Sequence, residues 1–247
     1  MENKEKSFAI RTFGRIHGKK LSIRQTWLVD NILPTLIPNS QSPVPKNRKV
    51  ILEIGFGAGE HLVYLAETHP DALIVGAEPY MNGIASLLSR MTYQGAESRE
   101  HRAKGNAISI IRPEYKNIRI WPDDVRKLLN NCSVLSALCS LQNINSCFAK
   151  IYILHPDPWP KARHEKRRLL SAEFMKDLAD RLVPNGQIII STDHADYFAW
   201  IIEQAAQISN LTHQIYDLPP EPGLDTRYKK KDMFGRNKTQ YLVLTGR

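Results

Sequence analysis

Short apolar runs alternate along the chain with longer amphipathic segments. Between the runs, the segments 60–69 (EHLVYLAETH) and 171–182 (SAEFMKDLADRL) place apolar residues at helical spacing. This alternation predicts an α/β fold, doubly wound around a mostly parallel sheet. Consecutive apolar, β-branched positions indicate strands buried on both faces at 49–55 (KVILEIG), 72–78 (ALIVGAE), 117–121 (NIRIW), 149–155 (AKIYILH) and 187–192 (QIIIST).

Local signals predict where the later elements end. Ser171 suits the N-cap of the second helix, and Pro184-Asn185-Gly186 predicts its end. The apolar segments 213–219 (HQIYDLP) and 239–246 (TQYLVLTG) have no clear helix between them. We expect these two to close a seven-stranded sheet as an antiparallel pair.

Three segments fall outside this alternation. Residues 1–48 form a basic arm and one helix around Ile23–Leu33, ended by Pro34, which we expect to pack on a single domain spanning 49–247. Residues 94–116 have the look of an insertion before the third strand. Residues 219–238 form a long polar loop, and such loops are usually functional or disordered.

The charge of the chain points to an anionic partner. With 34 Lys and Arg against 25 Asp and Glu, the net charge is 34 − 25 = +9. The excess is local, so a basic surface facing phosphates is as good an interpretation as general solubility. It falls at Arg11 to Arg24, at 161–168 and at Arg227 to Lys238.

Composition also narrows the class of protein. The three cysteines, Cys132, Cys139 and Cys147, are odd in number and lack CxxC spacing, which argues against a disulfide framework and a zinc site. The N-terminus lacks an apolar signal segment, and no run approaches the ~18 apolar residues of a membrane span. We expect a cytoplasmic protein.

A glycine-rich turn follows the first strand, in the order Glu53-Ile-Gly55-Phe-Gly57-Ala-Gly59. Such glycines let the backbone approach a ligand closely at the N-terminus of the next helix. Glu78 ends the second strand, where an acid can accept both ribose hydroxyls of an adenosine. The alternatives are a solvated strand end for Glu78 and a local helix-terminal interaction for Glu53.

The GxGxG spacing resembles Rossmann-like methyltransferases that use S-adenosylmethionine more than it resembles NAD enzymes. In that case an acid after the third strand would accept from the adenine amine. Asp123 and Asp124 both follow that strand, and Asp124 is favoured because VRKLL then falls in helical register. The alternative is that either acid is a helix N-cap.

One acid is held rigidly after the fourth strand, in HPDPWPKARHEKRR (155–168). Pro156 and Pro158 restrict the backbone on both sides of Asp157, so its carboxylate has few conformations to lose on binding. Ligands of doubly wound sheets lie beyond the carboxyl ends of the strands, where this segment begins. Trp159 offers a face for a flat ring, or simply packs.

This segment is similar to the hallmark of bacterial tRNA (guanine-N7-)-methyltransferases, which carry PDPW and a basic RHxKRR tail. The sequences ILEIGFGAGEHL, RTFGRIHGKKLS, STDH and LDTRY resemble further motifs of that family, in order along most of the chain. Two features depart from the family pattern. Lys229 stands where the family usually has Glu, and the segments 94–116 and 130–148 are longer than expected.

The resemblance implies methyl transfer from S-adenosylmethionine to N7 of a guanine in tRNA, guanosine 46 of the variable loop, leaving S-adenosylhomocysteine. It implies no metal and no obligate protein partner. Asp157 would be the catalytic residue. The cofactor would be bound by Glu53, Gly55, Gly57, Gly59, Glu78 and Asp124, and the substrate by Lys161, Asp193, Thr226, Arg227 and Tyr228.

Three other functions remain open from the sequence. An RNA amino-methyltransferase acting on an exocyclic amine would typically have two adjacent prolines after the fourth strand, whereas here Asp157 separates them. A non-catalytic tRNA-binding protein should have a damaged glycine turn or a damaged Asp157 segment. An NAD-dependent oxidoreductase should have GxGxxG and has no need of the basic surface.

The basic cluster gives a first prediction. Its five cations are expected to grip tRNA phosphates, which position the RNA, while the target base is read by stacking and edge contacts. Neutralising them should weaken tRNA binding and flatten its dependence on salt. Binding titrations across salt concentrations check this, and unchanged curves would reject it. The cluster consists of Lys161, Arg163, Lys166, Arg167 and Arg168.

Overall fold

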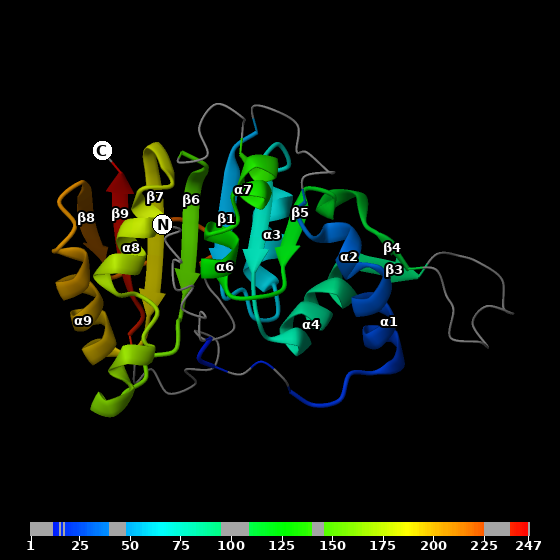
Figure 1. The fold of residues 1–247 in the computed structure, drawn as a ribbon, viewed down its shortest axis with the longest axis horizontal. Helices are drawn as coiled ribbons and strands as arrows, with labels where there is room; N and C mark the ends of the chain where they lie inside the picture. Colours follow the sequence, from blue (N-terminus) through cyan, green and yellow to red (C-terminus); the bar gives the residue numbers. More distant parts are fainter. Residues whose placement is uncertain are drawn as a thin grey trace, which may run out of the picture.

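The fold was analysed in a computed structural model, which describes residues 12–14, 16, 18–39, 48–94, 109–139, 146–224 and 238–246. A seven-stranded sheet runs through these residues in the order β5-β2-β1-β6-β7-β9-β8 (Figure 1). The α/β fold expected from the sequence is therefore confirmed. The strands are β1 (Val50–Ile54), β2 (Leu73–Ala77), β5 (Ile118–Trp121), β6 (Phe148–Leu154), β7 (Leu182–Thr192), β8 (Leu211–Tyr216) and β9 (Gln240–Gly246).

The sheet is mostly parallel. Strand β1 pairs in parallel with β2 and β6, and the parallel pairing continues to β5 on one side and β7 on the other. Strand β9 is antiparallel to both of its neighbours, β7 and β8. The central strands β1 and β2 are buried at every position, as their continuous apolar runs predict.

Helices cover both faces of the sheet and create two hydrophobic cores. One core contains Leu28, Leu62 and Ile84 from α1, α3 and α4, and the other contains Val125, Phe174 and further residues of α6 to α9. Each set of helices buries one apolar stripe against the strands. Their bounds are α3 (Glu60–Thr68), α4 (Met81–Met91), α6 (Val125–Leu129), α7 (Cys132–Leu138), α8 (Ala172–Ala179) and α9 (Ala195–Ala205).

The N-terminal segment forms two helices rather than one. Helix α1 (Ile23–Asn31) begins with a capping box between Ser22 and Gln25, and α2 (Leu33–Leu36) follows at once. The expectation that Pro34 ends a single helix was wrong, because Pro34 lies in the first turn of α2, where its missing N–H costs nothing. Leu28 is fully buried, and α1 packs on α4.

The ending predicted for α8 was also wrong. The helix begins after its N-cap Ser171, as expected, but it ends at Ala179, and β7 already starts at Leu182. Pro184-Asn185-Gly186 therefore lies inside β7. The pairing with β6 shifts register there, and Asn185 adopts a positive φ of 61°, so a local bulge accommodates the proline.

Two segments add structure beyond the main sheet. The segment expected to be an insertion, 94–116, contains β4 (Ser109–Ile111), which pairs antiparallel with β3 (Thr92–Gln94) at its start, and the 3₁₀ turn η1 (Pro113–Tyr115). Cys139 and Cys147 form a disulfide, which contradicts the expectation drawn from cysteine number and spacing. The fold brings their Cα atoms to 5.1 Å, and this distance cannot be read from sequence spacing.

Over the described ranges, the helices are too short or too polar to cross a membrane.

Helix α4 approaches the glycine turn closely at Gly83, and this contact generates a prediction. A Cβ added at Gly83 would lie 2.3 Å from the backbone oxygen of Gly57. Alanine is the better helix former by about 1 kcal/mol, yet Gly83→Ala should lower the free energy of unfolding by about 1–3 kcal/mol, because α4 or the turn must move. Urea unfolding measures this. Ser89→Ala on the same helix is the control. An equal increase in the free energy of unfolding in both variants would contradict the close approach at Gly83.

Candidate cofactor and substrate site

The glycine turn between β1 and α3 leaves open space above its backbone. Gly55 and Gly57 have positive φ angles of 74° and 55°, and a Cβ added to either would meet nothing within 4 Å. Gly59 is the N-cap residue of α3. The turn therefore offers an exposed stretch of main chain beside a helix N-terminus, where a ligand can approach closely.

Glu78 closes the turn from the end of β2. One carboxylate oxygen accepts from the Gly57 N–H at 2.7 Å and the other accepts from the Tyr80 N–H at 2.8 Å. Burial raises the pKa of Glu78, these two hydrogen bonds oppose the rise, and the charges of Glu53 and Asp157 add to it. The carboxylate is fixed by the main chain and is not a solvated strand end, since the residue is 6% exposed.

Glu53 meets the first turn of α3 rather than solvent. Its Oε2 lies 3.3 Å from Nδ1 of His61, and both side chains are buried. The His61 ring packs edge-on against Tyr152, with ring centres 4.8 Å apart. A helix-terminal contact of Glu53, one alternative from the sequence, is therefore present in the structure, and it fixes this carboxylate beside the glycine turn.

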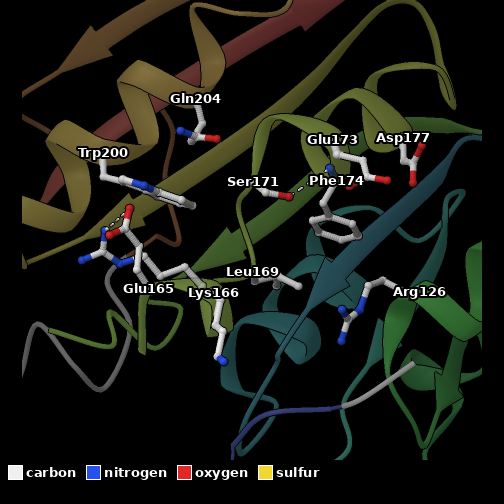
Figure 2. Close-up of a pocket in the computed structure, with 11 residues that line it drawn as sticks. Arg126, Glu165, Lys166, Leu169, Ser171, Glu173, Phe174, Asp177, Trp200 and Gln204 are labelled. Atoms are coloured by element: carbon white, nitrogen blue, oxygen red, sulfur yellow. Dashed lines mark hydrogen bonds and ion pairs between the residues drawn. The ribbon is translucent and has the colours of Figure 1, made fainter. Parts of the chain in front are cut away.

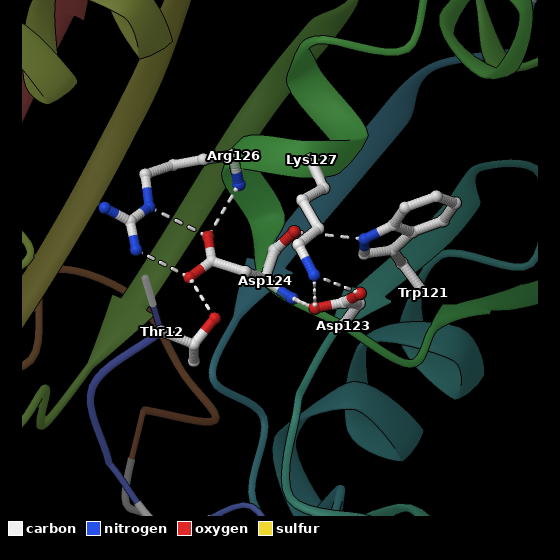
Figure 3. A network of polar contacts seen from close by, with 6 residues as sticks. All are labelled: Thr12, Trp121, Asp123, Asp124, Arg126 and Lys127. Atoms are coloured by element: carbon white, nitrogen blue, oxygen red, sulfur yellow. Dashed lines mark hydrogen bonds and ion pairs between the residues drawn. The ribbon is translucent and has the colours of Figure 1, made fainter. Parts of the chain in front are cut away.

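Asp124 lies at the centre of a polar network (Figure 3). It caps α6: Oδ1 accepts from the Arg126 N–H and Nε–H, both at 2.9 Å. Its Oδ2 accepts from Nη2 of Arg126 at 2.7 Å and from the Thr12 hydroxyl at 3.0 Å. Burial alone would raise the pKa of Asp124, but the hydrogen bonds from Arg126 and Thr12 outweigh it and lower the pKa.

Asp123 differs from Asp124 in exposure. Its side chain is 40% exposed and is paired with Lys127, whose Nζ donates to both carboxylate oxygens at 2.9 and 2.7 Å. Oδ1 also accepts from the Asp124 N–H at 2.7 Å. Four donors therefore fill the acceptor positions of Asp124, whereas within the described ranges the Oδ2 of Asp123 meets one.

Asp157 is exposed at the carboxyl end of β6, on a constrained loop. His155 and Trp159 on either side adopt positive φ angles of 52° and 46°, which are rare for such side chains and cost energy. Its charge adds to the raised pKa of Glu78, which follows β2 at the same edge of the sheet. The N-terminal arm also reaches this point, because a Cβ at Gly14 would lie 3.5 Å from Oδ2 of Asp157.

Arg167 joins the arm to the loop. Its guanidinium carbon lies 5.6 Å from the ring centre of Phe13 and 5.0 Å from that of Trp159. The ring of His164 meets Trp159 edge-on at 5.8 Å. Trp159 is therefore packed between charged and aromatic groups, which agrees with simple packing, one of the two roles expected for it from the sequence. Stacking between a cation and two rings anchors the arm at Phe13.

The basic cluster divides into two groups. Lys161, Arg163 and Lys166 are exposed on and beside η2 (Ala162–Arg167), so their charges face solvent. Burial, with the charges of Arg167, Arg163 and Lys161, lowers the pKa of His164 among them. Arg168 turns inward, and its side chain is 10% exposed.

Asp193 and the polar loop complete the set of expected residues. Asp193 follows β7 and is 45% exposed, with Oδ1 3.8 Å from Nδ1 of His155. Burial lowers the pKa of His155, although Asp193 opposes this. The expected substrate residues Thr226, Arg227 and Tyr228, like Lys229, lie outside the described residues.

A hollow of about 610 Å³ adjoins the loop on the side of α8 and α9 (Figure 2). Trp200, Leu169 and Phe174 give it apolar walls, while cations and acids balance around its rim. Sequence reasoning did not single out this hollow, nor Thr12, Phe13 and Arg126, because their contacts join segments far apart in the chain. The polar lining consists of Arg126, Glu165, Lys166, Arg168, Ser171, Glu173, Asp177 and Gln204.

Comparison with known proteins identifies the family. Residues 47–233 match the family described as "Putative methyltransferase". A tRNA (guanine-N(7)-)-methyltransferase of Erythrobacter litoralis is 33% identical, covering 90% of this chain and 87% of its own. A protein of the same name from Caulobacter sp. (strain K31) is 31% identical, covering 91% and 90%. A solved 16S rRNA (adenine(1408)-N(1))-methyltransferase from Catenulisporales acidiphilia superposes with a TM-score of 0.48 at 13% identity, covering 96% and 98%.

The motifs and these relatives agree. The chain belongs to the family of bacterial tRNA (guanine-N7-)-methyltransferases.

Proposed function

We propose that this enzyme transfers a methyl group from S-adenosylmethionine to N7 of a guanine in tRNA, with guanosine 46 of the variable loop as the expected target. The observation that supports this best is the arrangement of Asp157. An exposed carboxylate on a proline-flanked loop lies at the carboxyl end of β6, which pairs in parallel with β1, the strand that leads into the open glycine turn. A purine and a cofactor can meet there.

The residues around the turn fit S-adenosylmethionine. The open space above Gly55 and Gly57 admits a ligand against the main chain, with Gly59 at the helix N-terminus beyond them. Glu78 is held by two N–H groups with its oxygens at the rim of the turn, suited to accept from ribose hydroxyls. Glu53, fixed by His61, would face the amino group at the methionine end. When bound, the cofactor supplies an electrophilic methyl group on a sulfonium.

For the adenine amine, Asp123 is the better acceptor. The carboxylate of Asp124 already accepts four hydrogen bonds, so a further donor would have to displace Thr12 or Arg126. Asp123 lies one residue earlier on the same loop and is 40% exposed. We therefore assign the adenine contact to Asp123 and a structural role to Asp124.

Guanine N7 has an in-plane lone pair at neutral pH, so no base is needed to remove a proton before attack. Alignment is the main task of the enzyme, and it can lower the barrier by about 7–11 kcal/mol. Asp157 would accept from the N1–H and the amino group of the guanine. Its negative charge would also stabilise the purine as that ring becomes cationic.

The tRNA would lie across η2. Lys161, Arg163 and Lys166 are exposed beside Asp157 and can neutralise phosphates around the target base. Asp193 lies on the neighbouring strand end and would contact the base or ribose. Thr226, Arg227 and Tyr228 would approach from the loop before β9. In this proposal residues 49–247 act as one domain, with 1–48 packed on it.

The role of Asp157 gives a prediction. Asp157→Ala removes one or two charge-assisted hydrogen bonds of about 1.5–3 kcal/mol each, so turnover should fall by roughly 10- to 10⁴-fold. The affinity for S-adenosylmethionine should stay within a few-fold, because the carboxylate contacts the base and not the cofactor. Single-turnover methyl transfer and cofactor titration measure the two effects. Wild-type turnover in the variant would remove Asp157 from the mechanism.

Asp123 and Asp124 form a matched pair for a second prediction. Asp124→Ala should lower the free energy of unfolding by about 1–2 kcal/mol at neutral pH, since it removes the cap of α6. The folded protein holds the pKa of Asp124 below its ordinary 3.8, so this contribution is present above pH 3.8. It is lost as the pH falls through the lower folded value. Urea unfolding from pH 3 to 7 follows this difference.

Asp123→Ala should instead leave unfolding almost unchanged and weaken S-adenosylmethionine binding. If the affinity for S-adenosylmethionine is unchanged in Asp123→Ala but falls strongly in Asp124→Ala, the adenine contact is made by Asp124 instead.

The activity itself is tested by incubating the enzyme with unmodified tRNA and labelled S-adenosylmethionine, then digesting the product to nucleosides. We expect 7-methylguanosine, located at the variable loop by mapping. A methyl group on an exocyclic amine would identify an amino-methyltransferase instead. Unmodified tRNA would point to a binding protein without catalysis.

A further inference from the structure

We propose that Arg168 is a positioning residue for Asp157, and that its guanidinium fixes the catalytic loop instead of binding a tRNA phosphate. The inference rests on the proposed role of Asp157. It separates Arg168 from the neighbouring cations, with which it shares a run of basic sequence but not an environment.

The guanidinium of Arg168 makes a direct contact with the loop. Its Nε–H donates to the backbone oxygen of Pro158 at 3.0 Å. This carbonyl belongs to the peptide bond between Pro158 and Trp159, one residue after Asp157. Trp159 itself adopts an unfavourable φ of 46°, so the loop needs an external contact to hold its conformation.

The remaining faces of the guanidinium are held by helix α9 and by η2. Its central carbon lies 5.3 Å from the ring centre of Tyr197 and 5.0 Å from that of Trp200. Nη1 lies 3.8 Å from Oε1 of Glu165, and the Arg168 backbone N–H donates to the backbone oxygen of Glu165 at 2.9 Å. Tyr197 is fully buried, so this support is rigid.

These surroundings are unsuited to a phosphate. The Arg168 side chain is 10% exposed, and the rings and Glu165 occupy the positions that a phosphate would need. Trp200 and Glu165 line the 610 Å³ hollow beside Arg168, where three acids balance three cations, so the hollow offers no excess positive charge to a phosphate (Figure 2). Arg163 and Lys166, in contrast, are exposed.

The function of the contact follows from the loop chemistry. The rings of Pro156 and Pro158 fix their own φ angles, and Pro158 also restricts Asp157 before it, but the ψ angle of Pro158 is left to be set. A planar guanidinium held at three sides can set the orientation of one carbonyl, which a mobile ammonium cannot. Arg168 thereby limits the directions in which the Asp157 carboxylate points.

The test compares Arg168→Lys with Arg163→Ala, measuring kcat, the KM for tRNA, the salt dependence of tRNA binding and the affinity for S-adenosylmethionine. Arg168→Lys keeps the charge but loses the directed Nε–H and the planar stack. It should lower kcat by about 10- to 100-fold, with KM, salt slope and cofactor affinity within about threefold of wild type. Arg163→Ala should raise the KM and flatten the salt slope.

Two results would overturn the inference. One is a wild-type kcat in Arg168→Lys. The other is a raised KM for tRNA and a flatter salt slope in Arg168→Ala with kcat retained, which would show that Arg168 binds a phosphate. Cofactor affinity and the unfolding midpoint show whether each variant is folded. Because Arg168→Lys preserves the side-chain stem and the charge, it decides the matter if Arg168→Ala does not fold.

A double-mutant cycle with Asp157→Asn separates this inference from the proposed function. If Arg168 acts through Asp157, the double variant should be no slower than Asp157→Asn alone. If the loss of kcat in the double variant equals the product of the losses in the two single variants, Arg168 acts independently of Asp157, and its positioning role is overturned. Full activity in Asp157→Asn would instead count against the proposed function, whatever Arg168→Lys does.

Discussion

The carboxyl edge of the sheet must hold four acidic side chains close together, and the rest of the site depends on how their charges are balanced. Three of them lie against partners within the protein. Two main-chain N–H groups hold Glu78, His61 meets Glu53, and Arg126 with Thr12 surrounds Asp124. Asp157 is different, because it is exposed on a loop that prolines and Arg168 constrain. The edge therefore presents one carboxylate that is fixed in place and available to a ligand.

The arm before α1 takes part in this balance. Thr12 reaches the acid after β5, while Phe13 and Gly14 lie against the loop after β6, so three consecutive residues bridge two strand ends. The arm then continues to α4, where the Met81 N–H donates to the backbone oxygen of Ile16 at 3.2 Å and the Gly18 N–H donates to Oδ1 of Asn82 at 2.9 Å. The arm therefore runs along the carboxyl edge of the sheet, from the loop after β6 to the start of α4.

The fold could be predicted from the sequence because its signals are local and periodic. Continuous apolar runs mark β1 and β2, and the helices between strands have the expected spacing. The errors arose where a non-local contact overrode a local signal. Pro184-Asn185-Gly186 ordinarily ends an element, but pairing with β6 draws it into a strand with a bulge. The Cys139–Cys147 disulfide likewise depends on the end of α7 meeting the start of β6.

The same contrast between local signals and non-local contacts applies to the candidate site. Glu53 lies in β1, Glu78 directly follows β2 and Asp157 lies three residues after β6, so a recognisable motif at a strand end marks each of them as a candidate. The choice between Asp123 and Asp124 needed their hydrogen-bond partners, which come from α6 and from the distant Thr12. The five cations at 161–168 look alike as residue types. The burial of Arg168 and the stacking of Arg167 separate them in the structure.

The direction of β9 has a consequence for which segments meet at the carboxyl edge of the sheet. Gln240, at its start, pairs with Thr192, at the end of β7, so the chain enters β9 from the edge where Asp157 and Asp193 lie. A parallel strand of the same seven residues would begin at the opposite edge, about 20 Å away. The reversed direction of this one strand thus places the start of β9 at the edge where Asp157 and Asp193 lie. If β9 ran parallel to β7, a further crossover helix would be needed before it.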